Sequence, residues 1–248
     1  MNLKREIQKA IANQEFKLYY QPIIDLETNE IAGQEALIRW HHPADILRMP
    51  IDFIPECEAD PDIMVEICEF VVRQAWSDRD KLAGDFISVN VSPKSLEQKR
   101  FWDVLEAHSL VSDRPIFFLE ITERSLCNHK IIAPHFIKSG ESGIGAFIDD
   151  FGVEYSGYIQ VAKVLDLFPN TEYVKVKLDI EFARNLASPT YQYFAKSIID
   201  SMRNFPFGKI DVIAEGIEYE WQRDLFKDYG VKYGQGWLWG KAEAIANT

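Results

Sequence analysis

Short apolar runs rich in β-branched and aromatic residues recur along the whole chain, separated by stretches with helical spacing. This alternation constrains the fold more than any other feature, because buried strands that alternate with helices form a parallel sheet. Two helical stretches carry Met64, Ile67, Val71 and Ala75, and Trp221, Leu225 and Tyr229. The predicted strands cover residues 16–24, 30–38, 86–91, 116–121, 144–148, 173–178 and 211–214.

The number of strand–helix units favours a closed barrel over an open sheet. Six or more such units in 248 residues predict an α/β fold, a TIM-like (β/α)8 barrel. The first two strands are separated by a short hairpin-like connection, which indicates one antiparallel strand. Ser92 followed by Pro93 is typical of a helix start, and Gly230 is expected to end the last helix. No linker or low-complexity tract divides residues 1–248, so we expect a single domain.

Charge and cysteine content narrow the class of partner. The formal net charge is -12, which opposes binding of extended nucleic acid. The three cysteines, Cys57, Cys68 and Cys127, are widely spaced, so neither a disulfide framework nor a zinc site is indicated. No apolar run approaches the roughly 20 residues of a membrane span. We therefore expect a cytoplasmic protein that does not cross a membrane through this domain.

Polar side chains of the kind that bind metals lie at or near the ends of successive predicted strands. Each could by itself be a helix cap or a solvated loop residue. In a barrel, however, the strand ends meet on one face, and clustered carboxylates need a compensating cation. Oxygen ligands without His or Cys indicate Mg²⁺ or Mn²⁺ rather than Zn²⁺. The residues are Glu35, Asn90, Glu120, Asp149, Asp150, Lys177, Asp179, Glu215 and Gln235.

The motifs that contain these residues resemble the EAL family of cyclic di-GMP phosphodiesterases over nearly the whole chain. They occur in the family order: LYYQP, GQEALIRW with Glu35-Ala36-Leu37, HP, FIPECE, SVNVS, LEITE, DDFG, KLD, AEGIE and QG. One EAL tripeptide would be weak support, whereas this many motifs in order are specific.

The resemblance implies a site with two divalent cations, Mg²⁺ or Mn²⁺, that share a water molecule. The implied ligands are Glu35, Asn90, Glu120 and Asp149 for one ion, and Asp149, Asp150 and Glu215 for the other. The implied catalytic residues are Lys177, Glu215 and Asp149. The implied substrate-binding residues are Gln21, Arg39, Asp179 and Gln235. Glu123 resembles a glutamate that stabilises the loop after DDFG, rather than a metal ligand.

The activity implied is hydrolysis of one phosphodiester bond of cyclic di-GMP to linear pGpG. The loop Val153-Glu154-Tyr155-Ser156-Gly157 departs from the usual Thr-Gly-Tyr-Ser-Ser, and Glu154 adds a negative charge close to the predicted metals. The alternative is therefore a catalytically silent receptor for cyclic di-GMP or for a protein partner. An unrelated barrel enzyme would explain the carboxylates but not the motif order.

The resemblance also suggests a homodimer, and sensor or output domains if the chain is part of a longer protein.

Overall fold

The computed structural model describes residues 3–44, 46–109, 117–121, 134–135, 143–152, 157–167 and 171–245. Several residues named above lie outside these ranges: Glu123, Cys127, Val153, Glu154, Tyr155 and Ser156. The strands are β1 (Phe16–Asp25), β2 (Ile31–His42), β3 (Ile46–Arg48), β4 (Phe86–Asn90), β5 (Phe117–Ile121), β6 (Ile144–Phe151), β7 (Val174–Leu178), β8 (Asp211–Ala214), β9 (Tyr233–Gly234) and β10 (Glu243–Ala244).

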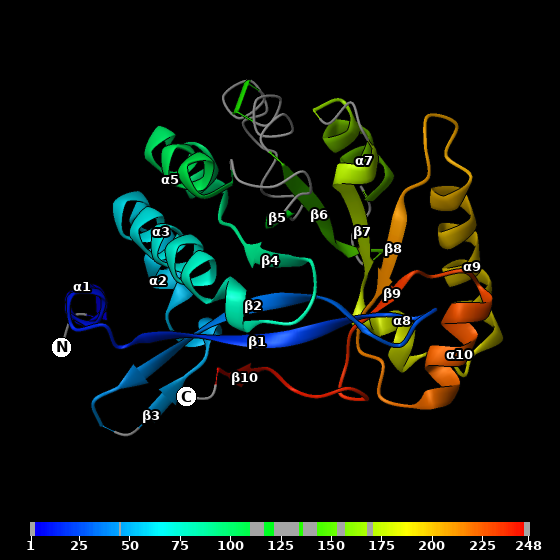
Figure 1. Ribbon diagram of the computed structural model, residues 1–248, viewed down its shortest axis with the longest axis horizontal. Coiled ribbons are helices and arrows are strands. Elements are labelled where there is room, and N and C mark those ends of the chain that lie inside the picture. The colour runs from blue at the N-terminus through cyan, green and yellow to red at the C-terminus, as the bar shows by residue number, and fades with distance from the viewer. Residues whose placement is uncertain are drawn as a thin grey trace.

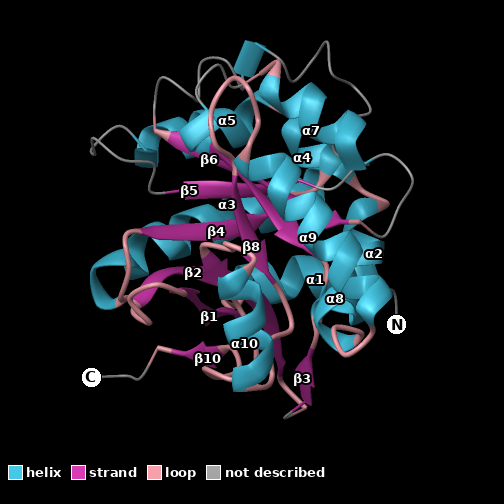
Figure 2. Cartoon of the chain, turned by 90° about the vertical axis from the view of Figure 1, so that its right-hand side faces the viewer, coloured by secondary structure: helices cyan, strands magenta, loops and turns pink. Residues whose placement is uncertain are grey.

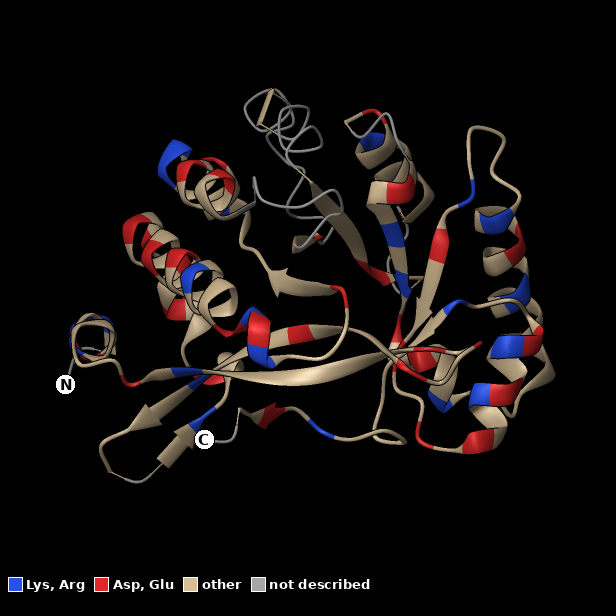
Figure 3. Cartoon of the chain, in the orientation of Figure 1, with Lys and Arg blue, Asp and Glu red and all other residues tan. Residues whose placement is uncertain are grey.

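Helices connect and cover these strands. The α-helices are α1 (Leu3–Ala12), α2 (Ile54–Glu58), α3 (Pro61–Asp78), α4 (Pro93–Leu96), α5 (Lys99–Ser109), α7 (Gly157–Leu165), α8 (Ile180–Arg184), α9 (Pro189–Arg203) and α10 (Glu220–Asp228). Short 3-10 helices cover Pro50–Asp52, Arg79–Lys81 and Thr171–Tyr173. The outer helices α3, α5, α9 and α10 carry charges of both signs (Figure 3). No helix in the described part of the chain is long and apolar enough to span a bilayer.

The strands close into a barrel. The hydrogen-bonded ring runs β1-β9-β8-β7-β6-β5-β4-β2 and returns from β2 to β1 (Figures 1 and 2). β1 is antiparallel to both of its neighbours, β2 and β9, whereas the other pairs of the ring are parallel. The predicted barrel with one antiparallel strand is therefore confirmed. β3 and β10 add short antiparallel extensions to β2 and β1.

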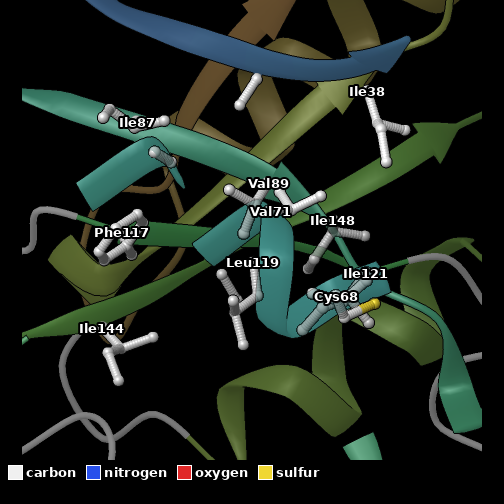
Figure 4. Packing of buried hydrophobic residues seen from close by; sticks show 14 of the residues in the cluster. Ile38, Cys68, Val71, Ile87, Val89, Phe117, Leu119, Ile121, Ile144 and Ile148 are labelled. Atoms are coloured by element: carbon white, nitrogen blue, oxygen red, sulfur yellow. The ribbon is translucent and has the colours of Figure 1, made fainter. Parts of the chain in front are cut away.

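Two apolar layers hold the barrel together. Inside it, the aromatic rings of Phe86, Phe118 and Phe147 pack against one another with centroid separations of 4.6 to 5.7 Å. Outside it, helices bury the opposite faces of the same strands. Figure 4 shows Cys68 and Val71 of α3 among strand residues such as Val89. β5 and β7 are buried on both faces, although β7 alternates valine with Lys175 and Lys177 and β5 contains Glu120.

Local signals in the sequence place several helix ends correctly. The Ser92 hydroxyl accepts a hydrogen bond from the Lys94 backbone N–H, and Pro93 begins α4 as predicted. Gly230 follows α10 with a φ of 85°, a conformation that glycine adopts readily. The helical stretch predicted around Trp221 and Leu225 is confirmed as α10. Trp221 is 47% exposed, and Phe226 lies on the buried face.

A lysine lies inside the barrel near the end where the parallel strands begin. Lys175 is 7% exposed, and its Nζ lies 4.6 Å from the ring centroid of Phe118. It donates a hydrogen bond to the backbone oxygen of Glu172 at 3.2 Å. Burial lowers the pKa of Lys175 from 10.5 to about 8, although Asp211 opposes the change. The folded protein therefore bears the cost of burying an ammonium group at neutral pH.

We expect Lys175→Met to stabilise the protein at neutral pH, by up to about 3 kcal/mol, since each pKa unit is about 1.4 kcal/mol. Below pH 8 the lysine is charged in both states, so the full cost is present. Between pH 8 and 10.5 the folded state loses its proton first, and wild-type stability rises with pH. Urea unfolding at about pH 7 and about pH 9.5 should show the gain shrinking at the higher pH. An equal gain in the exposed control Lys163→Met would contradict this assignment.

Candidate functional site

A buried lysine lies among four carboxylates at the open end of the barrel. Lys177 is 2% exposed, and its Nζ lies 2.7 Å from both Glu120 Oε2 and Glu215 Oε1. The same atom lies 3.2 Å from Asp149 Oδ1 and 3.8 Å from Glu35 Oε2. The five side chains come from β2, β5, β6, β7 and the residue that follows β8. Residues far apart in the sequence thus form one charge cluster at the strand ends, as predicted.

Two amide side chains fix the position of Glu35 within this cluster. Asn90 Nδ2 donates a hydrogen bond to Glu35 Oε1 at 3.0 Å, and Gln235 Nε2 donates one to Glu35 Oε2 at 2.6 Å. Gln235 reaches the site because the chain after β9 passes against Ile217, whose backbone N–H donates a hydrogen bond to the backbone oxygen of Gln235. Gly236 permits this approach, since a Cβ at that position would collide with the Ile217 backbone. Both carboxylate oxygens of Glu35 are therefore held by neutral donors.

Burial and like charge alter the ionisation of the acidic residues. Burial, together with the charge of Glu35, raises the pKa of Glu120 well above its usual range. Burial also raises the pKa of Glu215, to about 7, although Lys177 opposes that change. Burial alone would lower the pKa of Lys177, but the surrounding carboxylates outweigh it and raise that pKa instead. The ammonium group therefore stays protonated and offsets part of the negative charge.

A local irregularity in β6 positions Asp149 and brings one further acid, Asp150, to the cluster. The register between β6 and β7 shifts between Ile148 and Phe151, so Asp149 and Asp150 lie in a bulge. Asp150 has a φ of 55°, which is unusual for a residue other than glycine and is typical of functional sites. One ligand oxygen from each of Asp149, Asp150 and Glu215 lies within 4.8 Å of the others. This spacing suits coordination of one divalent cation.

The oxygens in the cluster have the properties of metal ligands. Glu120 Oε1 and Gln235 Oε1 are buried, and neither accepts a hydrogen bond from the described residues. Orphaned acceptors of this kind are costly unless a cation or water satisfies them. The donor set consists of carboxylates and amides without His or Cys, which suits Mg²⁺ or Mn²⁺. The residues present therefore fit the cations expected from the sequence.

A pocket of about 950 Å³ opens beside the carboxylates. One wall carries Glu35, Asn90, Asp149, Asp150 and Asp179. Apolar lining comes from Pro50, Ile51, Ile54 and Pro55 and from residues of α3. A cavity of this size can hold a ligand as large as a dinucleotide.

Three of the predicted substrate-binding residues lie beside the charge cluster rather than in it. Arg39 is 8% exposed and donates a hydrogen bond to the backbone oxygen of Ile38 at 2.9 Å. Gln21 lies opposite Glu35 in the β1–β2 pair and donates a hydrogen bond to the Gly240 oxygen at 3.3 Å. Asp179 caps α8, accepting a hydrogen bond from the Glu181 N–H at 2.7 Å.

The structure adds pocket residues that the strand-end argument missed. Glu58, Ser92 and Lys94 line the pocket, and the Ser92 hydroxyl donates a hydrogen bond to Glu58 Oε1 at 3.4 Å. These residues belong to α2 and to the start of α4, so an argument based on strand ends did not identify them. The acid at the end of FIPECE was the only signal available for Glu58.

Comparison with known proteins identifies the family. The EAL domain family matches residues 4–242 of this chain. The chain belongs to the EAL domain family. It is 32% identical over 247 residues to the cyclic di-GMP phosphodiesterase PA2567 of Pseudomonas aeruginosa, covering 95% of this chain and 40% of that protein. It is 30% identical over 247 residues to the probable cyclic di-GMP phosphodiesterase PdeB of Escherichia coli, covering 95% of this chain and 44% of that protein.

Solved structures agree with this assignment of the EAL domain. A structure described as PaMucR phosphodiesterase in complex with c-di-GMP superposes with a TM-score of 0.83 at 26% identity, covering 98% of each chain. The chain spans less than half the length of the two curated relatives named above. These likenesses establish the EAL family and its barrel for this chain.

Proposed function

We propose that this EAL domain is a metal-dependent phosphodiesterase that hydrolyses one phosphodiester bond of cyclic di-GMP to linear pGpG. The observation that carries the proposal is the cluster of Glu35, Glu120, Asp149 and Glu215 around Lys177 at the open end of the barrel. Every carboxylate of the expected ligand set is present. A domain that had lost this chemistry would be expected to lack at least one of these side chains.

The proposed metal sites use the residues of the cluster. Glu35, Asn90, Glu120 and Asp149 would hold one Mg²⁺ or Mn²⁺, and Asp149, Asp150 and Glu215 would hold a second. When bound, the two cations would lower the pKa of water and neutralise charge on the phosphate. Gln235 orients Glu35 through its amide, a contact that fixes which carboxylate oxygens face the site.

The protein's own residues supply orientation and charge. In this proposal Lys177 directs its ammonium group at the attacking water and offsets charge that develops on the phosphoryl oxygens. Arg39 offers a planar guanidinium fork to the substrate phosphate, a geometry that suits two phosphoryl oxygens. Gln21, Asp179 and Gln235 complete the proposed substrate-binding set. The apolar wall of the pocket excludes water from part of the ligand.

A turnover assay tests the proposal. We expect purified protein to convert cyclic di-GMP to pGpG in the presence of Mg²⁺ or Mn²⁺ and to lose this activity in chelator. Product would be followed by chromatography, and binding would be measured on the same samples. Tight binding without turnover would overturn the hydrolase and favour a receptor. Neither binding nor turnover would favour a role in protein interaction.

Further parts of the proposal concern assembly and location. By analogy with its family we propose a homodimer in the cytoplasm, to be measured by sedimentation velocity. Two large apolar residues of α7, Tyr158 and Ile159, are 55% and 61% exposed and could be covered in such a dimer. We propose that residues 1–248 form a single EAL-type phosphodiesterase domain, with sensor or output domains if the chain is part of a longer protein.

A further inference from the structure

The strands β1 and β2 extend past the rim of the barrel beside the charge cluster. β2 pairs with β4 only from Gly33 to Ala36, whereas its pairing with β1 continues as far as Trp40. Side chains alternate between the faces of a strand, so Arg39 and His41 lie on the same face of β2 as Glu35. This extension carries the proposed phosphate-binding arginine away from the carboxylates. Something must hold its side chain in place there.

Tyr19 on the neighbouring strand lies against that arginine. The register pairs Tyr19 with Leu37, so its ring is a diagonal neighbour of Arg39, within reach of a long side chain. The Arg39 Cζ lies 5.7 Å from the centroid of the Tyr19 ring, within the range of a cation–π contact. Arg39 is 8% exposed, a burial that strengthens such a contact by removing water. The guanidinium group is thus bounded by an aromatic face.

His41 in turn fixes the tyrosine. The Tyr19 hydroxyl and His41 Nε2 are 3.3 Å apart, within hydrogen-bonding distance. The two rings also lie with centroids 5.9 Å apart and an interplanar angle of 37°. Tyr19 therefore spans the strand pair, with its ring against Arg39 and its hydroxyl at His41. Arg39 Nη1 also donates a hydrogen bond to the Ile38 backbone oxygen at 2.9 Å, which further restrains the guanidinium group.

We propose that Tyr19, anchored by His41, is a positioning residue that holds Arg39 ready for a phosphate group of the substrate. The inference rests on the proposed function, because it assigns Arg39 to the phosphodiester. A guanidinium fixed before the ligand arrives binds two phosphoryl oxygens without losing further side-chain freedom. Tyr19 acts through Arg39 and does not itself touch the reacting atoms. It therefore affects substrate affinity more than the chemical step.

Kinetics of Tyr19 variants test this role. We expect Tyr19→Leu to raise KM for cyclic di-GMP about tenfold while kcat changes less than about threefold, because an interaction common to ground and transition states is lost. Tyr19→Phe keeps the ring and should restore KM to within about threefold of the wild-type value. The matched control is Tyr193→Leu, since Tyr193 is 69% exposed on α9. It should leave KM unchanged.

A double-mutant cycle separates positioning from general stability. If Tyr19 acts through Arg39, Tyr19→Leu should add almost nothing to the KM of Arg39→Ala, although it raises the KM of the wild-type protein. An equal effect in both backgrounds, or no effect on the wild-type KM, would overturn the inference. If the wild-type protein binds cyclic di-GMP without turnover, Kd replaces KM in the same cycle.

The outcomes distinguish this inference from the function on which it rests. A wild-type protein that neither binds nor hydrolyses cyclic di-GMP overturns both. A wild-type protein that does so, with Arg39→Ala impaired and Tyr19→Leu normal, overturns only the role of Tyr19. Thermal unfolding of each variant would show whether Tyr19→Leu folds. If it does not, the single variants Tyr19→Phe and His41→Leu carry the test. Each removes the contact between the Tyr19 hydroxyl and His41, so each should raise KM by up to about threefold, and a wild-type KM in both would contradict the anchoring step.

Discussion

Replacing Glu35 by glutamine is expected to lower kcat for cyclic di-GMP hydrolysis by about a thousandfold or more, as when an essential electrostatic group is removed from an active site. Both oxygens of Glu35 accept hydrogen bonds, from Asn90 and from Gln235. A glutamine keeps the shape of the side chain but presents an NH₂ group to one of these two donors. It also removes the negative charge needed to hold a cation. Product formation measured by chromatography over a range of Mn²⁺ concentrations checks the expectation.

The control for this variant is another Glu→Gln change. Glu30 is exposed in the turn between β1 and β2, so Glu30→Gln should retain wild-type activity. Substantial hydrolysis by Glu35→Gln at saturating Mn²⁺ would show that Glu35 is not a metal ligand. The proposed role would be supported if the Glu35→Gln protein still folds but no longer binds metal, as measured by calorimetry.

The second large effect is expected at Lys177. Among the described residues, Lys177 is the only cation that forms ion pairs with Glu120 and Glu215. Lys177→Met removes it and leaves buried carboxylates facing one another. Breaking a buried charge network by removing one partner costs about 3–5 kcal/mol. In chelator, urea denaturation should therefore show the variant destabilised by about that amount. Hydrolysis should also be lost, because the ammonium group no longer orients the water.

Metal addition tests the cause of this destabilisation. If the carboxylates bind cations, Mn²⁺ should stabilise Lys177→Met more than it stabilises the wild-type protein. The bound cation would offset the repulsion between the carboxylates that Lys177 no longer compensates. Lys196→Met is the matched control, since Lys196 forms an exposed ion pair with Asp200 on α9 and should cost about 0.5 kcal/mol or less. A Lys177→Met protein as stable in chelator as the wild type would contradict the charge argument.

Much of the barrel could be predicted from local sequence. β5 begins with the apolar run Phe117-Phe118-Leu119, so it was visible without any tertiary information, whereas β7 was visible through its alternating valines. β9 was missed because only Tyr233 and Gly234 form it, and two residues carry no periodic pattern. The helical spacing of Trp221, Leu225 and Tyr229 indicated α10 but not which of its faces meets the barrel, and Trp221 is 47% exposed.

The sequence by itself determined which residues stand at the strand ends, and with them the composition of the charge cluster. Parallel strands in a closed barrel end on one face whatever the details of their loops, so Glu35, Glu120 and Glu215 could be expected to meet. Only the tertiary structure decided how they meet. The bulge that turns Asp150 to a positive φ, and the contact of Tyr19 with Arg39, depend on register between strands. Register is set by packing across the whole barrel, and one chain segment read alone does not contain it.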